Sequence, residues 1–400
     1  MIPRLSAPFD VTDARALVSG WMRPGGEATF EAVMAEMVGK RFALAFPSGR
    51  SGFHALIKAM GWQGREIVLP AYTCAVMGNT VLASGNRPRL VDINGSDFNM
   101  ELGALASAVG RDTAAVVATH MYGFPMDLEG LDKALEGHPK VVVIQDCALA
   151  LGARYQGHPV WRGGLAALFS FSLGKHLSTV EGGVMATDDE VLYAAMKDYR
   201  DRAHHSAGIV RVARQSAFFI AGWLGLRPWL YSLVHGLATH TGALDFLNKH
   251  YEPDRVYLPP NFRERLPNCL GHLGVNQVGK ASGLVSRHIE ISETYRRELA
   301  EVPGLNWPTP RDGASFSHCP CLIEDRNGFI AFMAGQGIHV GKEVFDYALP
   351  DIPLLASFAD RDCLEAKKAA HCVTLLPNHP NLSDNDVQQV IVAARRWSAL

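Results

Sequence analysis

This sequence has little net charge, no closely spaced cysteine pair and no signal-peptide pattern at its start. Its 400 residues carry 38 lysine and arginine residues against 40 aspartate and glutamate residues, so the formal net charge is −2. That balance gives no reason to expect a nucleic-acid partner or bulk attraction to an acidic membrane. The seven cysteines include no Cys-x-x-Cys pair, which argues against a disulfide framework and a zinc ribbon. The first ten residues lack the basic and apolar regions of a signal peptide, so we expect a cytoplasmic protein.

An apolar run long and clean enough to span a membrane is also missing, although one block comes close. The block extends over residues 217–237, near the length of about 20 residues that a span needs. Arg227 and Pro228 lie at its middle. A central arginine costs roughly 2.5 to 3.5 kcal/mol on insertion scales, and proline interrupts the helix hydrogen bonds. We therefore expect two short apolar helices, buried at a subunit contact or inside the chain, with contact to a membrane surface as the alternative.

Between residues 40 and 190, short β-rich runs alternate with helical patterns. Several of the runs are continuously apolar, as in parallel strands that are covered on both faces. The alternation predicts an α/β layered domain. The predicted strands are Glu66–Leu69, Arg89–Asp92, Ala114–Thr119, Val141–Asp146, Leu168–Phe171 and Gly183–Thr187, and helices are predicted at Gly52–Met60 and Asp127–Leu135.

The chain is long enough for two domains, because 400 residues exceed the usual size of a single core. A polar, proline-rich stretch at residues 260–267 indicates a domain joint. We expect a large domain over residues 1–262 and a smaller C-terminal domain over residues 263–400. The small domain should contain one helix with Val278, Ala281, Val285 and Ile289 on one face and a last helix, Asp384–Trp397, capped from Ser383.

Two residues follow predicted strands at positions that suit one cofactor chemistry. Lys175 comes shortly after an apolar strand, and Asp146 closes another. In pyridoxal phosphate (PLP) chemistry, a lysine forms a Schiff base with the cofactor aldehyde, and a carboxylate keeps the ring nitrogen protonated. If the two side chains face one pocket, the chain is a transaminase-like enzyme. Taken singly, Lys175 is more often a surface lysine and Asp146 a helix cap.

Three further signals are weak when each is taken alone. The stretch Ser48-Gly49-Arg50-Ser51-Gly52 precedes a helical pattern, and the free N–H groups at a helix start bind phosphate well, although a plain turn is the commoner meaning. Ser170 is either a buried strand hydroxyl or a second phosphate ligand. His120 also follows a strand, where site residues of open α/β sheets collect, or it is a buried histidine with ordinary partners.

The order of these signals resembles the DegT/DnrJ/EryC1/StrS family of fold-type-I, PLP-dependent aminotransferases, which mostly act on nucleotide-linked keto-sugars. The resemblance runs from about Phe46 to Asp189 and more loosely over the rest of the chain. The matching stretches are Ser48-Gly49 with His54-Ala55-Leu56, Val68–Thr73, Pro88 with Val91-Asp92, Asp112–Ala115, His120–Gly123, Gln145–Ala148 with Gly152-Ala153, Phe169–Phe171 with Lys175, Glu181–Gly183 and Leu376–Pro380.

The resemblance implies a fold and a set of roles. The fold would be a large domain with a mostly parallel seven-stranded sheet, plus the smaller α/β domain. Lys175 would form the Schiff base and shuttle the proton, and Asp146 would hold the ring nitrogen. The cofactor phosphate would be bound by backbone N–H groups of Gly49, Arg50 and Ser51 and by the hydroxyl of Ser170. A homodimer with active sites at the subunit contact and an amino acid donor such as glutamate are also implied.

The sequence departs from the family at several of these positions. Cys74 stands where the family has an aromatic residue that stacks on the cofactor ring, and Leu149 stands where a glutamine or histidine is usual. Arg50 replaces a threonine, and Asn268–Leu273 replaces an Asn-Tyr-Arg-like motif that reaches the neighbouring subunit. The region near residues 203–260 is an insertion.

The departures leave two alternatives open. One is another PLP reaction or a non-sugar or lipid-linked acceptor; the family's dehydratase branch fits less well, because it has histidine at the position of Lys175. The other is a non-catalytic descendant, against which the retention of Asp146 and Lys175 speaks.

Overall fold

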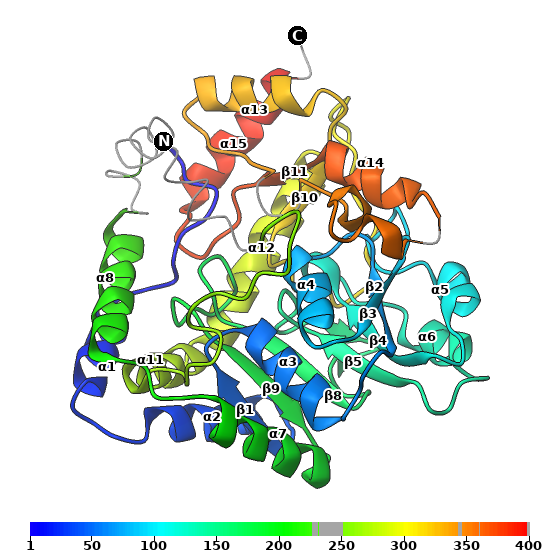
Figure 1. Cartoon of the computed structure of the whole chain (residues 1–400). Coiled ribbons are helices and arrows are strands. Elements are labelled where there is room, and N and C mark those ends of the chain that lie inside the picture. The colour runs from blue at the N-terminus through cyan, green and yellow to red at the C-terminus, as the bar shows by residue number, and fades with distance from the viewer. Residues whose placement is uncertain (226–230, 232–250, 343–345, 360, 398–400) are drawn as a thin grey trace.

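The computed structural model describes residues 1–225, 231, 251–342, 346–359 and 361–397. Figure 1 shows a twisted central sheet with helices on both of its faces. The C-terminal helices α13 and α15 lie at one end of the molecule, and helices α2 and α7 lie at the opposite end. This arrangement confirms the predicted α/β class.

The central sheet has seven strands in the order β1-β9-β8-β5-β4-β2-β3. β9 runs antiparallel to both of its neighbours, and the other adjacent pairs are parallel. The mostly parallel seven-stranded sheet is therefore confirmed. The strands are β1 (Phe42–Phe46), β2 (Glu66–Pro70), β3 (Arg87–Val91), β4 (Thr113–Thr119), β5 (Val142–Asp146), β8 (Ala166–Ser170) and β9 (Gly183–Thr187).

Two small antiparallel sheets stand apart from the central one. They are β6 (Arg154–Tyr155) with β7 (His158–Pro159), and β10 (Cys319–Leu322) with β11 (Val373–Leu376). The helices are α1 (Val11–Gly20), α2 (Gly26–Val38), α3 (Gly49–Ala59), α4 (Ala75–Ala83), α5 (Leu102–Ala108), α6 (Leu128–Ala134), α7 (Glu190–Ala203), α8 (Ile209–Gly225), α11 (Asn268–Val278), α12 (Ala281–Glu298), α13 (Arg326–Gly335), α14 (Leu364–Cys372) and α15 (Asp384–Trp397), with short 3-10 turns η1 (Met121–Gly123), η2 (Leu349–Asp351) and η3 (Ala356–Phe358).

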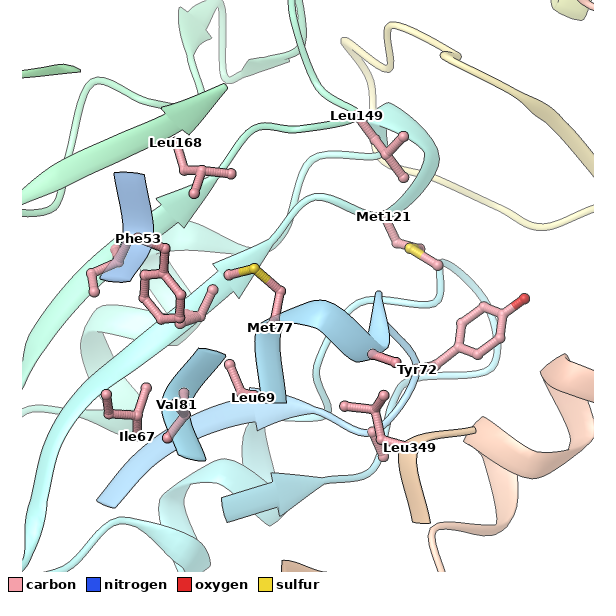
Figure 2. Close-up of a cluster of buried hydrophobic side chains, with 14 of the residues drawn as sticks. Phe53, Ile67, Leu69, Tyr72, Met77, Val81, Met121, Leu149, Leu168 and Leu349 are labelled. Atoms are coloured by element: carbon pink, nitrogen blue, oxygen red, sulfur yellow. The ribbon is translucent and has the colours of Figure 1, made fainter. Parts of the chain in front are cut away.

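The side chains of each strand point alternately to the two faces of the sheet and pack in different apolar cores. Leu44 of β1 packs with Phe53 and Leu69 on one face, whereas Ala45 packs with Phe30 on the other. Figure 2 shows the first of these cores, where Leu349 of η2 lies near Tyr72. The backbone N–H of Leu349 donates to the carbonyl of Ala71 at 2.8 Å. A segment from the C-terminal part of the chain is thus fixed beside the end of β2.

The C-terminal helices agree with the sequence in one case and differ in another. α15 spans Asp384–Trp397 as predicted, and the hydroxyl of Ser383 accepts from the N–H of Asp386 at 3.1 Å. The single helix predicted across Val278 and Ala281 is wrong, because α11 ends at Val278 and α12 begins at Ala281. Gly279, a residue of low helix propensity, closes α11 and separates the two helices.

The apolar block at residues 217–237 is described in part. α8 begins at Ile209 and runs through its first portion, while residues 226–230 and 232–237, with Arg227 and Pro228, lie outside the described residues. Phe219 is buried, with its ring 4.5 Å from that of Phe9, and Tyr231 is buried as well. Within the described ranges, no helix has both the length and the apolar character needed to cross a membrane.

Candidate active site

Asp146 is the last residue of β5, and the sheet register fixes its surroundings. It pairs with Thr119 of the neighbouring parallel strand β4. Its Oδ1 accepts from the N–H of Ala148 at 3.0 Å, and its Oδ2 accepts from the hydroxyl of Thr119 at 3.4 Å. Burial raises the pKa of this carboxyl, and the Ala148 N–H, the charge of Lys175 and the Thr119 hydroxyl oppose the rise. A buried carboxylate in this state is stabilised further by a cation placed against it.

Lys175 follows β8, the strand on the other side of β5. Gly174 before it has φ +83°, so the chain turns sharply here, and the Lys175 N–H donates to the carbonyl of Ser172 at 3.3 Å. Burial lowers the pKa of the amine, opposed by the neighbouring Cys74 and Asp146. The structure therefore brings Lys175, Asp146 and Cys74 together.

The start of α3 forms a second part of the candidate site. Ser48 is its N-cap, and its Oγ accepts from the N–H of Ser51 at 3.3 Å. Ser51 is engaged further, because its own hydroxyl donates to the carbonyl of Phe262 at 2.9 Å and lies 3.1 Å from the Ser48 hydroxyl. The helix start also touches β9: a Cβ on Gly183 would lie 2.3 Å from the Gly49 nitrogen, so only glycine fits there.

Ser170 lies close to the start of α3 through the same glycine. Gly183 pairs with Ser170 of β8 on one side and with Phe46 of β1 on the other. The half-buried Ser170 thus ends β8, which is separated from β1 in the sheet only by β9. β1 in turn leads directly into the N-terminus of α3. The sequence motif around Gly49 and the hydroxyl of Ser170 lie at the same edge of the sheet.

Arg50 joins the two parts of the site. Burial lowers the pKa of its guanidinium, opposed by Cys74, Tyr257 and Tyr347. Cys74 is thus near both Arg50 and Lys175, although the two cations belong to different elements. Tyr257 and Tyr347 were not anticipated from the sequence, since nothing in their local pattern shows that two remote segments meet beside Cys74.

His120 has ordinary partners rather than an open position. It is fully buried, its Nε2 lies 2.9 Å from Oε1 of Gln145, and its Nδ1 accepts from the N–H of Met126 at 3.1 Å. Burial lowers its pKa to about 4, opposed by the Gln145 hydrogen bond. Both ring nitrogens are therefore committed to holding the end of β4 in place.

Behind Lys175 lies a group of buried histidines that the sequence did not single out. The Nε2 of His176 lies 3.0 Å from the carbonyl oxygen of Ser315, and its ring is 4.9 Å from that of His288. The Nε2 of His379 lies 3.1 Å from the carbonyl oxygen of Pro3. Burial lowers the pKa of His176 and of His379 to about 4, so neither adds a positive charge near Lys175 at neutral pH.

The stretch at Asn268 is engaged within its own chain. The Oδ1 of Asn268 accepts from the N–H of Gly26 at 2.6 Å, and its Nδ2 donates to the carbonyl of Gly20 at 2.8 Å. Asn268 therefore fastens α11 to the segment between α1 and α2. The side chain that the resemblance would send to a neighbouring subunit has a local structural task here.

Residues 10–395 match the DegT/DnrJ/EryC1/StrS aminotransferase family. The chain belongs to this family. The GDP-perosamine synthase of Vibrio cholerae is 23% identical over 405 residues, which cover 98% of this chain and 97% of the relative. The UDP-4-amino-4-deoxy-L-arabinose–oxoglutarate aminotransferase of Shewanella sediminis is 24% identical over 400 residues, covering 95% and 92%.

The solved structures agree with the family. The E. coli GDP-4-keto-6-deoxy-D-mannose-3-dehydratase with bound hydrated PLP has a TM-score of 0.79 at 17% identity, covering 98% of this chain and 99% of that chain. The fold is that of the fold-type-I PLP-dependent transferases, and the protein is a PLP-dependent aminotransferase of the DegT/DnrJ/EryC1/StrS family.

The residues of the candidate site fit PLP. Burial favours the neutral form of the amine, which is the form that reacts with an aldehyde, and a protonated ring nitrogen would stabilise the buried carboxylate against the effect of burial. The start of α3, with Ser170 beside it, suits a phosphate because the helix N-terminus carries partial positive charge.

Proposed function

We propose that this aminotransferase moves the amino group of an amino acid such as glutamate to a keto-sugar carried on a nucleotide. The observation that carries the proposal is the position of Lys175 beside Asp146 at one edge of the sheet. The names of two relatives specify nucleotide-linked amino sugars, GDP-perosamine and UDP-4-amino-4-deoxy-L-arabinose, and support this substrate class. The product would serve polysaccharide, glycan or natural-product biosynthesis.

Lys175 and Asp146 are the proposed catalytic residues. The cofactor, when bound, supplies an aldehyde and an electron-accepting ring. Because burial lowers the pKa of Lys175, a larger share of its amine is neutral at pH 7 and able to accept a proton from the substrate carbon. Asp146 would hold the proton on the ring nitrogen, oriented by Thr119 and the N–H of Ala148.

The remaining proposed contacts are to the cofactor phosphate and ring. The backbone N–H groups of Gly49, Arg50 and Ser51 and the hydroxyl of Ser170 would bind the phosphate, and Cys74 would border the ring. Of these four groups, the N–H of Ser51 would contribute least to phosphate binding, because it already donates to the Ser48 hydroxyl. The guanidinium of Arg50 would add a charge that the helix start alone lacks.

We also propose the assembly and the domain division. The protein would be a cytoplasmic homodimer with active sites at the subunit contact, with a large domain over residues 1–262 and a small one over residues 263–400. A separate apolar cluster that includes Tyr295, Phe329 and Ile391 supports a second domain core. The inserted region would serve the subunit contact or internal packing, and membrane contact through residues 217–237 is the competing hypothesis.

The test of the function is a pair of half-reactions. Glutamate added to the PLP-loaded protein should convert its visible absorbance band and release one equivalent of 2-oxoglutarate. Keto-sugars linked to GDP, UDP or dTDP should then be screened for restoration of the band. Release of 2-oxoglutarate without restoration by any of the nucleotide sugars would contradict the proposed acceptor.

A second acceptor class is favoured by one specific set of observations. Cys74, Leu149 and the inserted region differ from the family's usual pattern, and the end of the insertion reaches the candidate site through Tyr257. A non-sugar or lipid-linked acceptor would fit a site altered in this way. The same half-reaction with an undecaprenyl-linked keto-sugar distinguishes it from the nucleotide sugars.

A further inference from the structure

Two tyrosines from remote segments form an aromatic wall beside Cys74. Tyr347 lies two residues before η2, and Tyr251 begins the described stretch at the end of the inserted region. Their ring centroids are 5.4 Å apart at an angle of 60°, an edge-on contact of the kind that aromatic pairs prefer. Tyr347 lies beside Cys74, because its hydroxyl bonds the N–H of the next residue, Ala75.

The position of Tyr347 is fixed by the start of α4. Cys74 is the N-cap of this helix and makes no side-chain cap hydrogen bond in the described part of the chain. The hydroxyl of Tyr347 takes over this task and accepts from the N–H of Ala75 at 3.1 Å. Two residues later, the N–H of Leu349 bonds to the carbonyl of Ala71. Tyr347 is therefore held at its hydroxyl, and its segment is held again two residues further along the chain.

The segment that carries Tyr251 is fixed just as firmly. The buried side chain of Asn79 on α4 bonds both backbone groups of Tyr257, accepting from its N–H at 3.0 Å and donating to its carbonyl. The carbonyl of Pro253 accepts from the N–H of Leu354 at 2.9 Å. Since buried amide groups that satisfy a backbone are costly to remove, Tyr251 has a stable place behind Tyr347.

The wall borders the space that a planar group on Lys175 would occupy. Cys74 lies near Lys175, and the Tyr347 hydroxyl bonds the N–H of Ala75, the residue after Cys74. A planar ring attached to the Lys175 amine would therefore lie close to Cys74. A thiol covers little of such a ring, whereas an aromatic side chain provides a flat surface of matching shape.

We infer that Tyr347, backed by Tyr251, is the aromatic residue that positions the cofactor ring over Lys175. This inference rests on the proposed function. It assigns to Tyr347 the contact with the face of the cofactor ring that the small thiol of Cys74 cannot provide. Tyr347 is thus a cofactor-positioning residue, and its hydroxyl is a separate structural device that caps α4.

The experiment separates the ring of Tyr347 from its hydroxyl. The apoprotein is titrated with PLP, and the dissociation constant and the circular dichroism of the visible band are measured. Tyr347→Leu should weaken PLP binding about tenfold and reduce the dichroism of the band, because the ring contact is lost. Tyr347→Phe keeps the ring and should stay within about threefold of the parent. Tyr193→Leu, which removes a ring stacked on Phe42 away from Lys175, is the matched control and should bind PLP as the parent does.

A rescue variant keeps the inference testable if Tyr347→Leu folds poorly. Cys74→Tyr combined with Tyr347→Met supplies an aromatic ring from position 74 in place of the one lost at position 347. This double variant should restore both the PLP affinity and the dichroism of the visible band relative to Tyr347→Met alone. Parent-like binding and dichroism in Tyr347→Leu or Tyr347→Met would overturn the inference while the proposed function stands. A parent protein that forms no visible band with PLP would overturn both.

Discussion

Asp146 closes β5 and lies in electrostatic contact with Lys175, which follows the adjacent strand β8. Burial acts on the two groups in opposite directions, raising the pKa of the carboxyl and lowering that of the amine, and each partner counteracts the other's shift. A cofactor that takes up the amine and presents a protonated nitrogen to the carboxylate would satisfy both groups.

The first prediction concerns the covalent contact. Lys175→Ala should abolish the visible band of the PLP-loaded protein and its turnover, because no other amine is in place to bind the aldehyde. The fold should survive, since the main structural contact of Lys175 is made by its backbone. Lys197→Ala, which removes an exposed lysine paired with Asp201, is the control. The same band in Lys175→Ala as in the parent would remove Lys175 from its role.

The second prediction concerns the ring nitrogen. Asp146→Asn keeps the shape of the side chain but removes its charge, so kcat should fall roughly 10²- to 10³-fold, or about 3 to 4 kcal/mol, as for other single preorganised electrostatic groups. Asp188→Asn, at an exposed carboxylate that pairs with Lys40, should leave kcat unchanged. Turnover of Asp146→Asn near that of the parent would show that this carboxylate is not at the cofactor.

Much of the fold could be predicted because the sheet is covered on both faces. Val116 and Val117 of β4 are both fully buried, so the strand appears in the sequence as an unbroken apolar run. β1 was missed because alanine, which strands disfavour, alternates with its bulky residues in Phe42–Phe46. The break at Gly279 was missed because apolar spacing continues across it from Val278 to Ala281.

The candidate site was predictable where its residues lie at or just after strand ends or at a helix start. Asp146 and Lys175 could be singled out because parallel strands bring their carboxyl ends to one edge of the sheet. Tyr347 and Tyr251 could not, since their meeting depends on long-range contacts such as that between Leu354 and Pro253. The hydrogen bond from the Ser51 hydroxyl to the carbonyl of Phe262 was likewise not predictable, because it joins the start of α3 to a remote segment of the chain.

The third prediction concerns acid stability. Burial lowers the pKa of His120, His176 and His379 to about 4, from an ordinary value of 6.5 in the unfolded chain. Between pH 6.5 and pH 4 the unfolded chain therefore binds protons that the folded chain does not. Stability present above pH 6.5 is lost as the pH falls, by up to about 1.4 kcal/mol per pH unit for each histidine.

Urea unfolding at a series of pH values measures this dependence. The free energy of unfolding should drop steeply from pH 6.5 to pH 4.5, and His176→Asn, which keeps a donor for the Ser315 carbonyl, should flatten the slope by about one histidine's share. A free energy that stays constant from pH 7 to pH 5 would mean that these histidines are already accessible to protons in the folded state.

The last prediction concerns the outer face of α8. Val210, Ile220 and Leu224 are 79%, 52% and 43% exposed, and they lie on one stripe of the helix with Ala213 and Ala217. An apolar stripe of this kind usually marks an interface. The helix has no lysine and two arginines, of which Arg211 is engaged with Glu181 and Glu264 and Arg214 is exposed. A single exposed arginine is far less than the basic polar face that is typical of a membrane-surface helix, which is rich in lysine and arginine. We therefore expect a second copy of the chain, and not lipid, to cover the stripe.

Sedimentation and vesicle flotation distinguish a subunit contact from a membrane contact at this stripe. Replacing both Ile220 and Leu224 by serine should raise the dimer dissociation constant, measured by analytical ultracentrifugation, at least about tenfold. The reason is that each subunit loses two apolar side chains from the interface. Phe219→Ser is the matched control: Phe219 is buried against Phe9, so this change should lower the melting temperature first. Flotation of the parent with anionic vesicles, lost in the Ile220→Ser and Leu224→Ser variant while the dimer persists, would instead establish α8 as a membrane contact and favour a lipid-linked acceptor.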